Sequence, residues 1–249
     1  MDAITETAAS DWMLPGLIPA AILALIVGYL LGSVSFSIII TKLFQKQDIR
    51  DFGSGNAGAT NVMRSVGKLP AALTFIFDFL KCILSIVVGY YLFVLVCEQA
   101  CAPETIAQIG KYASGIGCIL GHIFPLYFRF RGGKGVTTTA ALICLIDWRV
   151  FIPTFLTFLI IVLIKRIVSL GSVIGVSLYP VYTFIIMFLF DYVNTPLATD
   201  STASTIYILL STAAAVVIGG IVVLQHRTNI KRLMKGEEKP LTFRGKKSS

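Results

Sequence analysis

Residues 17–44 read LIPAAILALIVGYLLGSVSFSIIITKLF, a run whose only charged side chain is Lys42. A membrane-crossing α-helix needs about 20 consecutive, mainly apolar residues, so this stretch alone predicts a transmembrane helix. Six further apolar runs follow, at residues 70–96, 110–128, 135–147, 150–164, 167–190 and 204–225. The sequence therefore predicts an all-α integral membrane protein with seven transmembrane helices.

The composition of the 249-residue chain supports a membrane location. Hydrophobic residues make up 56% of the chain, charged residues 14%, and the mean hydropathy is +0.84, whereas about 25% of residues in a soluble domain are charged. Residues 1–249 are predicted to form a single polytopic membrane domain, with residues 1–16 as an outer N-terminal extension and residues 226–249 as a basic tail. The extension lacks Lys and Arg, which argues against a cleaved signal peptide.

The basic residues predict the orientation. Eighteen of the 21 Lys and Arg residues flank the first, third and fifth connections or lie in the tail. Because positive residues stay on the cytoplasmic side, the N-terminus is predicted outside and the C-terminus in the cytoplasm, which agrees with an odd number of spans. The fourth and fifth runs are short and meet at DWR (147–149), a predicted tight turn. Five spans with one re-entrant hairpin remain the alternative.

Three segments on the predicted cytoplasmic side are more polar than topology requires: DIRDFGSGNAGATNVMR (48–64), GHIFPLYFRFRGGKGVTTT (121–139) and HRTNIKRLMKGEEK (226–239). The glycines of the first permit a backbone whose N–H groups converge on an anion, although they would also serve ordinary turns. In the second, Lys134 lies between glycines before a helix start, which favours phosphate. In the third, His226 and Asn229 would share a face of a continuing helix. Together the segments predict a pocket for one or two phosphates.

Other polar residues have structural interpretations. Asp78 and Lys81 lie three apart within the second run and are expected to form an ion pair. His122 is expected to be a hydrogen-bonded helix-packing group, and a disulfide between Cys97 and Cys101 is possible in an outer loop. The chain has two histidines and no close carboxylate pair, so neither a metal site nor a cofactor is predicted. The net charge of +8 reflects topology and gives no reason to expect nucleic-acid binding.

Together with GSVSFS (32–37), the three polar segments resemble, in order and separation, the bacterial acyl-phosphate-dependent glycerol-3-phosphate acyltransferases of the PlsY type, over residues 28–239. The resemblance implies a multi-pass enzyme of the bacterial inner membrane whose active site faces the cytoplasm. It would move a fatty acyl group from acyl phosphate to the 1-hydroxyl of glycerol 3-phosphate, giving lysophosphatidic acid and inorganic phosphate for phospholipid synthesis. Its partners would be membrane lipid and, functionally, the soluble enzyme that makes acyl phosphate.

The same resemblance implies site residues. The predicted catalytic residues are Ser54, Arg64, Lys134 and His226. The predicted phosphate-binding residues are Ser54, Asn56, Asn61, Arg64, Gly132, Gly133, Lys134 and Asn229. We expect the cationic side chains and the loop amides to stabilise developing negative charge. The departing phosphate is the first choice for the group that takes the hydroxyl proton, and His226 is the second.

Three alternatives compete with this interpretation. Acyl-CoA-dependent acyltransferases of the soluble-domain kind place an aspartate five residues after a histidine, and neither His122 nor His226 has that partner. A secondary transporter for a phosphate-containing solute would explain charges within the membrane. However, the two halves of the chain show no internal repeat, and the polar segments cluster on one side. A purely structural membrane protein would not need three donor-rich loops.

Overall fold

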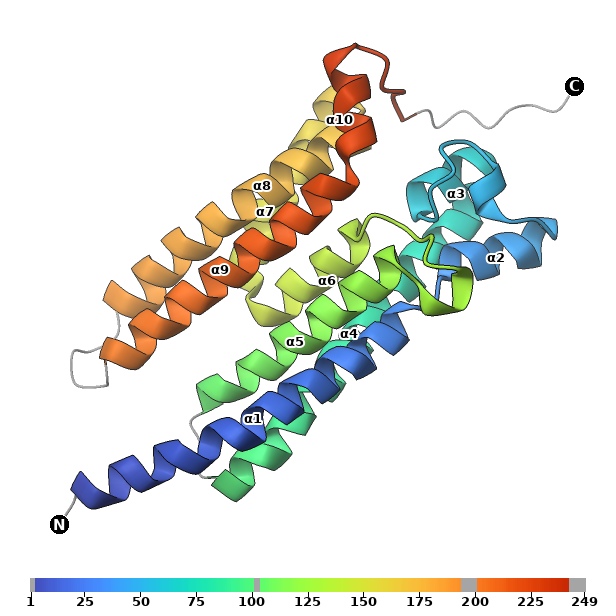
Figure 1. The fold of residues 1–249 in the computed structure, drawn as a ribbon. Helices are drawn as coiled ribbons and strands as arrows, with labels where there is room; N and C mark the ends of the chain where they lie inside the picture. Colours follow the sequence, from blue (N-terminus) through green and yellow to red (C-terminus); the bar gives the residue numbers. More distant parts are fainter. Residues whose placement is uncertain (1–2, 101–103, 194–200, 242–249) are drawn as a thin grey trace, which may run out of the picture.

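In the computed structural model, the described part of the chain forms helices and connecting loops without strands (Figure 1). The backbone is described for residues 3–100, 104–193 and 201–241, and the side chains for 17–95, 108–193, 205 and 207–241. The α-helices are α1 (Ala3–Gly32), α2 (Phe36–Gln45), α3 (Ala59–Ser65), α4 (Lys68–Ala100), α5 (Glu104–Ile123), α6 (Val136–Ile146), α7 (Trp148–Lys165), α8 (Val168–Met187), α9 (Ser201–Gln225) and α10 (Arg227–Met234). Short 3-10 turns cover Ile49–Asp51 and Leu126–Phe128, and a π-helical turn, Phe188–Val193, extends α8.

Each of the seven predicted apolar runs contains a helix. Among the described residues, five stretches are long and apolar enough to cross a membrane, and they lie in α1–α2, α4, α7, α8 with its π turn, and α9. Helix α6 has 11 residues and so spans about 17 Å at 1.5 Å per residue, well short of a bilayer core of about 30 Å. The predicted turn at DWR is confirmed, because α6 ends at Ile146 and the side chain of Asp147 caps α7 by accepting from the Arg149 N–H at 2.9 Å.

Two predicted runs, and the predicted continuation of the last helix, differ from the observed helices. The first run, predicted as one helix over 17–44, breaks after Gly32 and resumes at Phe36. The third run ends at Ile123 rather than 128, because the chain turns at Pro125, which has no N–H to continue a helix. The helix predicted to continue through His226 ends at Gln225, and α10 begins after His226 with a new direction (Figure 1).

The helices form two groups with α6 between them (Figure 1). Helices α1, α4 and α5 pack together, as do α7, α8 and α9, while α6 contacts α4, α5 and α7. Glycines allow α1 and α5 to approach closely: a Cβ on Gly32 would lie 2.2 Å from the Cys118 carbonyl oxygen, and one on Gly121 would lie 2.2 Å from that of Tyr29. Close packing of α1 against α5 therefore includes Gly32, the first residue of the GSVSFS segment.

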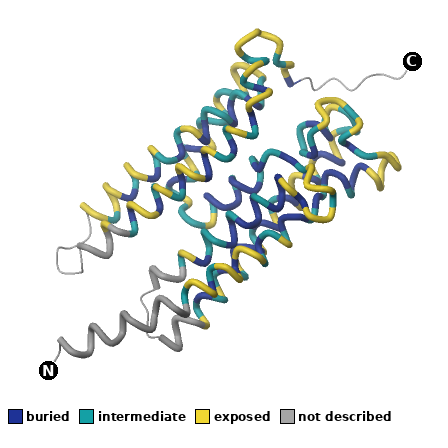
Figure 2. The backbone as a smooth tube through the Cα atoms, viewed as in Figure 1, coloured by how far each residue is buried: buried dark blue, intermediate teal, exposed yellow. Residues whose placement is uncertain are grey.

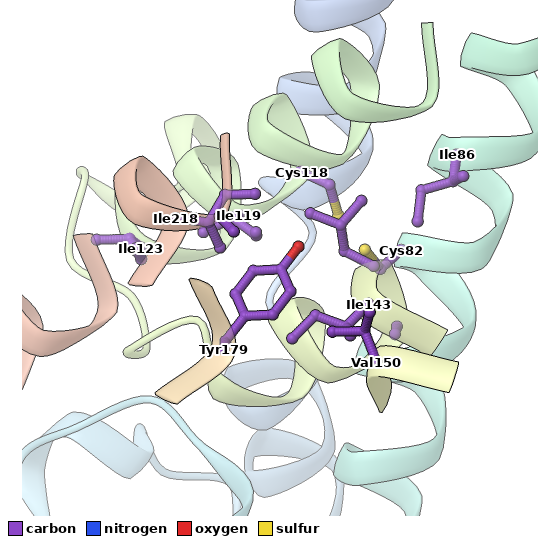
Figure 3. Close-up of a cluster of buried hydrophobic side chains, with 12 residues drawn as sticks. Cys82, Ile86, Cys118, Ile119, Ile123, Ile143, Val150, Tyr179 and Ile218 are labelled. Atoms are coloured by element: carbon purple, nitrogen blue, oxygen red, sulfur yellow. The ribbon is translucent and has the colours of Figure 1, made fainter. Parts of the chain in front are cut away.

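The buried core joins the two groups (Figure 3). It includes Cys82 of α4, Cys118 and Ile119 of α5, Tyr179 of α8 and Ile218 of α9. Outward-facing positions remain exposed (Figure 2), and many carry large apolar side chains such as Leu, Ile and Phe. An apolar outer surface is stable in lipid and agrees with an integral membrane protein.

The three polar segments gather at one end of the molecule. Helices α2, α3 and α10 and the loop after α5 lie there, at the end opposite the N-terminus (Figure 1). The convergence predicted from the sequence is confirmed, because residues of all three segments line one cavity. The side chains of Cys97 and Cys101 lie outside the described residues, so the possible disulfide stays a prediction.

Candidate active site

The loop before α3 is organised by one buried side chain, Asn61. Its amide nitrogen donates to the carbonyl oxygens of Ile49, Phe52 and Asn56 at 3.2, 2.9 and 3.0 Å, and its amide oxygen accepts from the Ser54 N–H at 3.0 Å. Asn61 therefore satisfies backbone groups that a tight loop would otherwise leave unpaired. Direct contact between Asn61 and a phosphate stays a prediction, because its hydrogen-bonding groups already hold the loop in shape.

Arg50 joins this loop to the loop that follows α5. Its guanidinium is held by the Asp48 carboxylate at 2.8 Å and donates to the carbonyl oxygens of Phe128 and Arg131 at 2.7 and 3.2 Å. The Ala57 N–H also approaches the Gly132 carbonyl oxygen, at 3.4 Å. Segments that are about 80 residues apart in the chain thus become one surface.

The two glycines before Lys134 are packing residues. The N–H groups of Gly132 and Gly133 donate to the carbonyl oxygens of Ile123 and His122, at 3.1 and 3.0 Å, and so complete the C-terminus of α5. A Cβ would lie 2.0 Å from the His122 carbonyl oxygen at Gly132 and 2.1 Å from the His122 Nε2 at Gly133. Both glycines also line a polar hollow beside Lys134, so their predicted phosphate binding stays a prediction. Their effect is to place Lys134.

A cavity of about 180 Å³ lies where the three segments meet. It is lined by the predicted residues Ser54, Asn56, Asn61, Arg64, Lys134, His226 and Asn229. The N-terminal residues of α6, Val136 and Thr137, line it as well, and the first-turn N–H groups of a helix have no partner within the helix. The predicted side chains therefore converge on one cavity.

Lys134 is a partly buried cation of the cavity wall. Its ammonium donates to the Asn229 amide oxygen. Burial lowers the pKa of Lys134 to about 8, against the opposing effect of the nearby Glu238 carboxylate and with further lowering by Arg232 and Arg64. The side chain is therefore a cation at neutral pH that has already lost much of its water, which strengthens its attraction for a phosphate.

The segment after α10 closes one side of the cavity. The Glu238 carboxylate accepts from Ser169 Oγ and Asn229 Nδ2, each at 2.7 Å, and from Arg232 Nε at 2.6 Å. Arg64 donates to the Lys239 carbonyl oxygen at 2.9 Å, so this predicted catalytic residue lies at the rim. Burial acts to raise the pKa of Glu238, but its three hydrogen bonds hold that pKa below the ordinary value. Glu238 is thus an internal anion among cations.

His226 is neutral and has a defined tautomer. Its Nδ1 lies 2.8 Å from the Val222 carbonyl oxygen, which only accepts, so the proton is on Nδ1 and Nε2 carries a lone pair. Burial lowers the pKa of His226 to about 4, despite the opposing effect of the Val222 hydrogen bond. The ring is buried and lines the cavity, where it can accept a hydrogen bond.

Two of the hollows that adjoin the central cavity differ in chemistry. One, of about 110 Å³, is almost wholly apolar and shares Phe75, Val136, Thr137, Phe158 and Ser172 with it. The other, of about 290 Å³, is polar and shares Lys134, Asn229 and Arg232 with the central cavity. Its cationic lining residues are Arg131, Lys134, Arg227 and Arg232. An apolar groove, a central cation and a basic hollow therefore adjoin one another.

The cavity contains residues that the sequence prediction missed. Ser169, Arg232 and Glu238 line it, and so do Asp78 and His122, which were assigned only structural roles. Arg232 and Glu238 lie within the quoted segment 226–239, but nothing in their spacing marks them. The predicted pair of Asp78 and Lys81 is confirmed, with 2.8 Å between Oδ1 and Nζ.

Comparison with known proteins identifies the family to which this arrangement is similar. A family model described as glycerol-3-phosphate acyltransferase matches residues 22–236. Proteins named glycerol-3-phosphate acyltransferase from Nostoc sp. and Finegoldia magna are 38% and 36% identical, covering 86% and 87% of this chain and 88% and 93% of their own lengths. Two crystal structures of PlsY (YgiH), an integral membrane glycerol 3-phosphate acyltransferase, in its glycerol 3-phosphate and lysophosphatidic acid forms, are 32% identical, with TM-scores of 0.68 and 0.66. They match 89% and 90% of this chain and 96% of theirs.

Proposed function

The chain belongs to the glycerol-3-phosphate acyltransferase family of integral membrane enzymes, and we propose that it takes its acyl group from an acyl phosphate. The acceptor is the 1-hydroxyl of glycerol 3-phosphate, and the products are lysophosphatidic acid and inorganic phosphate. The observation that carries this proposal is the direct continuity of the apolar groove with the cavity at Lys134. In an acyl phosphate, the phosphate is bonded directly to the acyl carbonyl, so the site for the acyl chain must adjoin the site for the phosphate. In an acyl-CoA, a long arm separates the thioester from the phosphates.

The acyl chain would lie in the groove that contains Phe75 and Phe158, with its phosphate in the central cavity. Glycerol 3-phosphate would enter from the basic hollow, which shares Lys134 and Asn229 with the central cavity. Lys134 lines both the cavity and the hollow, so its ammonium would lie between the two phosphates and reduce their repulsion. Holding both substrates beside one cation supplies the proximity that the transfer requires.

In the reaction, the hydroxyl oxygen attacks the acyl carbonyl carbon and the bond from that carbon to the phosphate oxygen breaks. The hydroxyl proton passes to the departing phosphate. The pKa of about 4 makes His226 a weak base, whereas the second pKa of a phosphate group is roughly 6. His226 Nε2 would accept the hydroxyl's hydrogen bond and orient its lone pair toward the carbonyl, while Ser54, Asn56 and Arg64 would contact phosphate oxygens.

The proposal extends to the setting of the enzyme. We place the cavity at the cytoplasmic face of a bacterial inner membrane, with seven membrane crossings, the N-terminus outside and the C-terminus inside. The cationic residues at the cavity end of the molecule support this orientation. Because α6 is short, the bilayer around α6 and α7 would be thinned locally. A soluble enzyme would supply the acyl phosphate from the cytoplasm.

The test is a turnover assay with purified protein. Palmitoyl phosphate and glycerol 3-phosphate are mixed, and both inorganic phosphate and the lysophospholipid are measured. We expect phosphate release to require both substrates and to disappear in Lys134→Ala. Palmitoyl-CoA is run in parallel, and turnover with the thioester but not with the acyl phosphate would refute the proposed donor.

A further inference from the structure

A buried charge network lies beside the phosphate cavity. Lys81 of α4 pairs with Asp78 at 2.8 Å and donates to the carbonyl oxygens of Gly32 and Val34 at 3.0 and 2.6 Å. These carbonyls belong to the break between α1 and α2. The same ammonium lies 3.2 Å from Nδ1 of His122 on α5. All three ionisable side chains are buried.

The network fixes the proton on the His122 ring. An ammonium group donates hydrogen bonds but cannot accept one. Lys81 Nζ lies 2.8 Å from Asp78 Oδ1 and donates to two carbonyl oxygens, and its contact with His122 Nδ1 at 3.2 Å is a hydrogen bond in which Lys81 is the donor. Nδ1 must therefore be the acceptor. A carboxylate oxygen of Asp78 lies 3.7 Å from Nδ1, beyond hydrogen-bond distance. A protonated ring would put a second cation 3.2 Å from the ammonium. His122 is consequently neutral with its proton on Nε2.

Within the described part of the chain, the Nε2–H is the ring group left for a ligand. Among the described residues, no hydrogen-bond partner faces His122 Nε2, although the residue is 96% buried, with a relative exposure of 4%. His122 lines the phosphate cavity. It also touches the loop that carries Lys134, since a Cβ on Gly133 would lie 2.1 Å from Nε2 and the Gly133 N–H donates to the His122 carbonyl oxygen.

We propose that His122 is a substrate-binding residue that donates a hydrogen bond from Nε2–H to a phosphate oxygen held by Lys134, and that Lys81 is the positioning residue that sets its tautomer. This inference rests on the proposed function and adds a role that the sequence did not predict. The two histidines then have opposite tasks in one cavity. His226, protonated on Nδ1, accepts from the hydroxyl, whereas His122, protonated on Nε2, donates to phosphate.

The tautomers are tested directly by nitrogen NMR. The chain has only two histidines, so protein made with ¹⁵N-histidine gives two rings, and His226→Ala assigns them. At pH 7 we expect both rings to be neutral, with the proton on Nε2 for His122 and on Nδ1 for His226. Added glycerol 3-phosphate or inorganic phosphate should shift the His122 Nε2–H signal. A His122 ring that is protonated on Nδ1, or on both nitrogens, would overturn the proposal.

Kinetics with two amide variants separates binding from packing. Glutamine at position 122 places an N–H near Nε2, whereas asparagine places its amide near Nδ1 and keeps only the link to Lys81. If the Nε2–H binds phosphate, His122→Asn should raise KM about tenfold or more for the substrate whose phosphate it contacts, and His122→Gln should stay within a few-fold of wild type. The two substrates are varied separately, so the affected KM identifies the phosphate.

The opposite ranking, with Asn active and Gln inactive, would assign His122 a packing role and refute the proposal. If neither variant yields folded protein, the NMR result on the wild-type chain decides. Wild-type turnover in the same assay separates this inference from the proposed function. Without wild-type turnover the proposed function fails, whereas wild-type turnover with an unaltered His122→Asn variant refutes only the role of His122.

Discussion

Replacing Lys134 by arginine should move the alkaline limb of the activity profile to higher pH. In the free enzyme, burial lowers the pKa of Lys134 to about 8. Only the protonated side chain can offset phosphate charge, so activity should be complete below this pKa and should be lost as the pH rises through it. Arginine has a pKa above about 12 and stays charged throughout this range.

The size of the effect follows from the pKa of about 8. Roughly half of the enzyme carries the ammonium at that pH, and about one tenth does so one pH unit higher. The value of kcat/KM should therefore fall about tenfold per pH unit on the alkaline side. A bound phosphate favours the charged lysine. The alkaline decrease of kcat, which reports the substrate complex, should therefore occur at higher pH than the alkaline decrease of kcat/KM.

The assay measures kcat/KM from about pH 6.5 to 9.5, with both substrates well below saturation and with the uncatalysed hydrolysis of acyl phosphate subtracted. Lys134→Arg is compared with wild type and with Lys165→Arg, which changes an exposed lysine at the end of α7. Arginine lowers the plateau because its geometry differs, but the position of the limb is the readout. A limb that stays in place in Lys134→Arg, or that moves in Lys165→Arg, would refute the assignment to Lys134.

Three further changes test other parts of the site. Asn61→Asp keeps the acceptor for the Ser54 N–H but removes the donor to three carbonyl oxygens. It should destabilise the protein by about 2–4 kcal/mol, measured by thermal unfolding in detergent, and an unchanged transition would contradict the loop role of Asn61. Gly133→Ala puts a Cβ 2.1 Å from His122 Nε2 and should lower kcat/KM for glycerol 3-phosphate at least tenfold, whereas wild-type kinetics would show that the loop moves freely. Ala140→Leu narrows the apolar groove and should reduce kcat/KM for palmitoyl phosphate more than for decanoyl phosphate; an equal effect on both would place the acyl chain elsewhere.

Much of the fold could be predicted from local sequence. Apolar runs of sufficient length require helices in lipid, because a helix satisfies its own backbone hydrogen bonds. The turn at Asp147 could be predicted from three residues because its cap is made by an immediate neighbour. The break after Gly32 could not, because its free carbonyls are satisfied by Lys81, which is 49 positions away in the chain.

In the candidate site, too, some features could be predicted from the sequence and others depend on contacts between distant parts of the chain. Lys134, His226 and Asn229 could be predicted because their chemistry suits a phosphate, and the structure brings all three to one cavity. The partners of Gly132 and Gly133 could not be predicted, since glycine-rich loops that bind phosphate and loops that complete a helix end have the same composition. Only the position of the last carbonyls of α5 decides between the two.

The paired histidines show why burial matters to this chemistry. A phosphate needs hydrogen-bond donors, and an attacking hydroxyl needs a hydrogen-bond acceptor. In an exposed neutral imidazole the proton exchanges between the two ring nitrogens, so each nitrogen is a donor part of the time and an acceptor part of the time. Here a backbone carbonyl fixes the proton of His226 on Nδ1, and the Lys81 ammonium fixes that of His122 on Nε2. Because each ring is buried, changing either tautomer would leave a buried group unsatisfied, which is costly. The Asp78–Lys81 pair within α4 therefore does more than stabilise helix packing. Because Lys81 donates to His122 Nδ1, the His122 ring presents an N–H group, and not a lone pair, at Nε2.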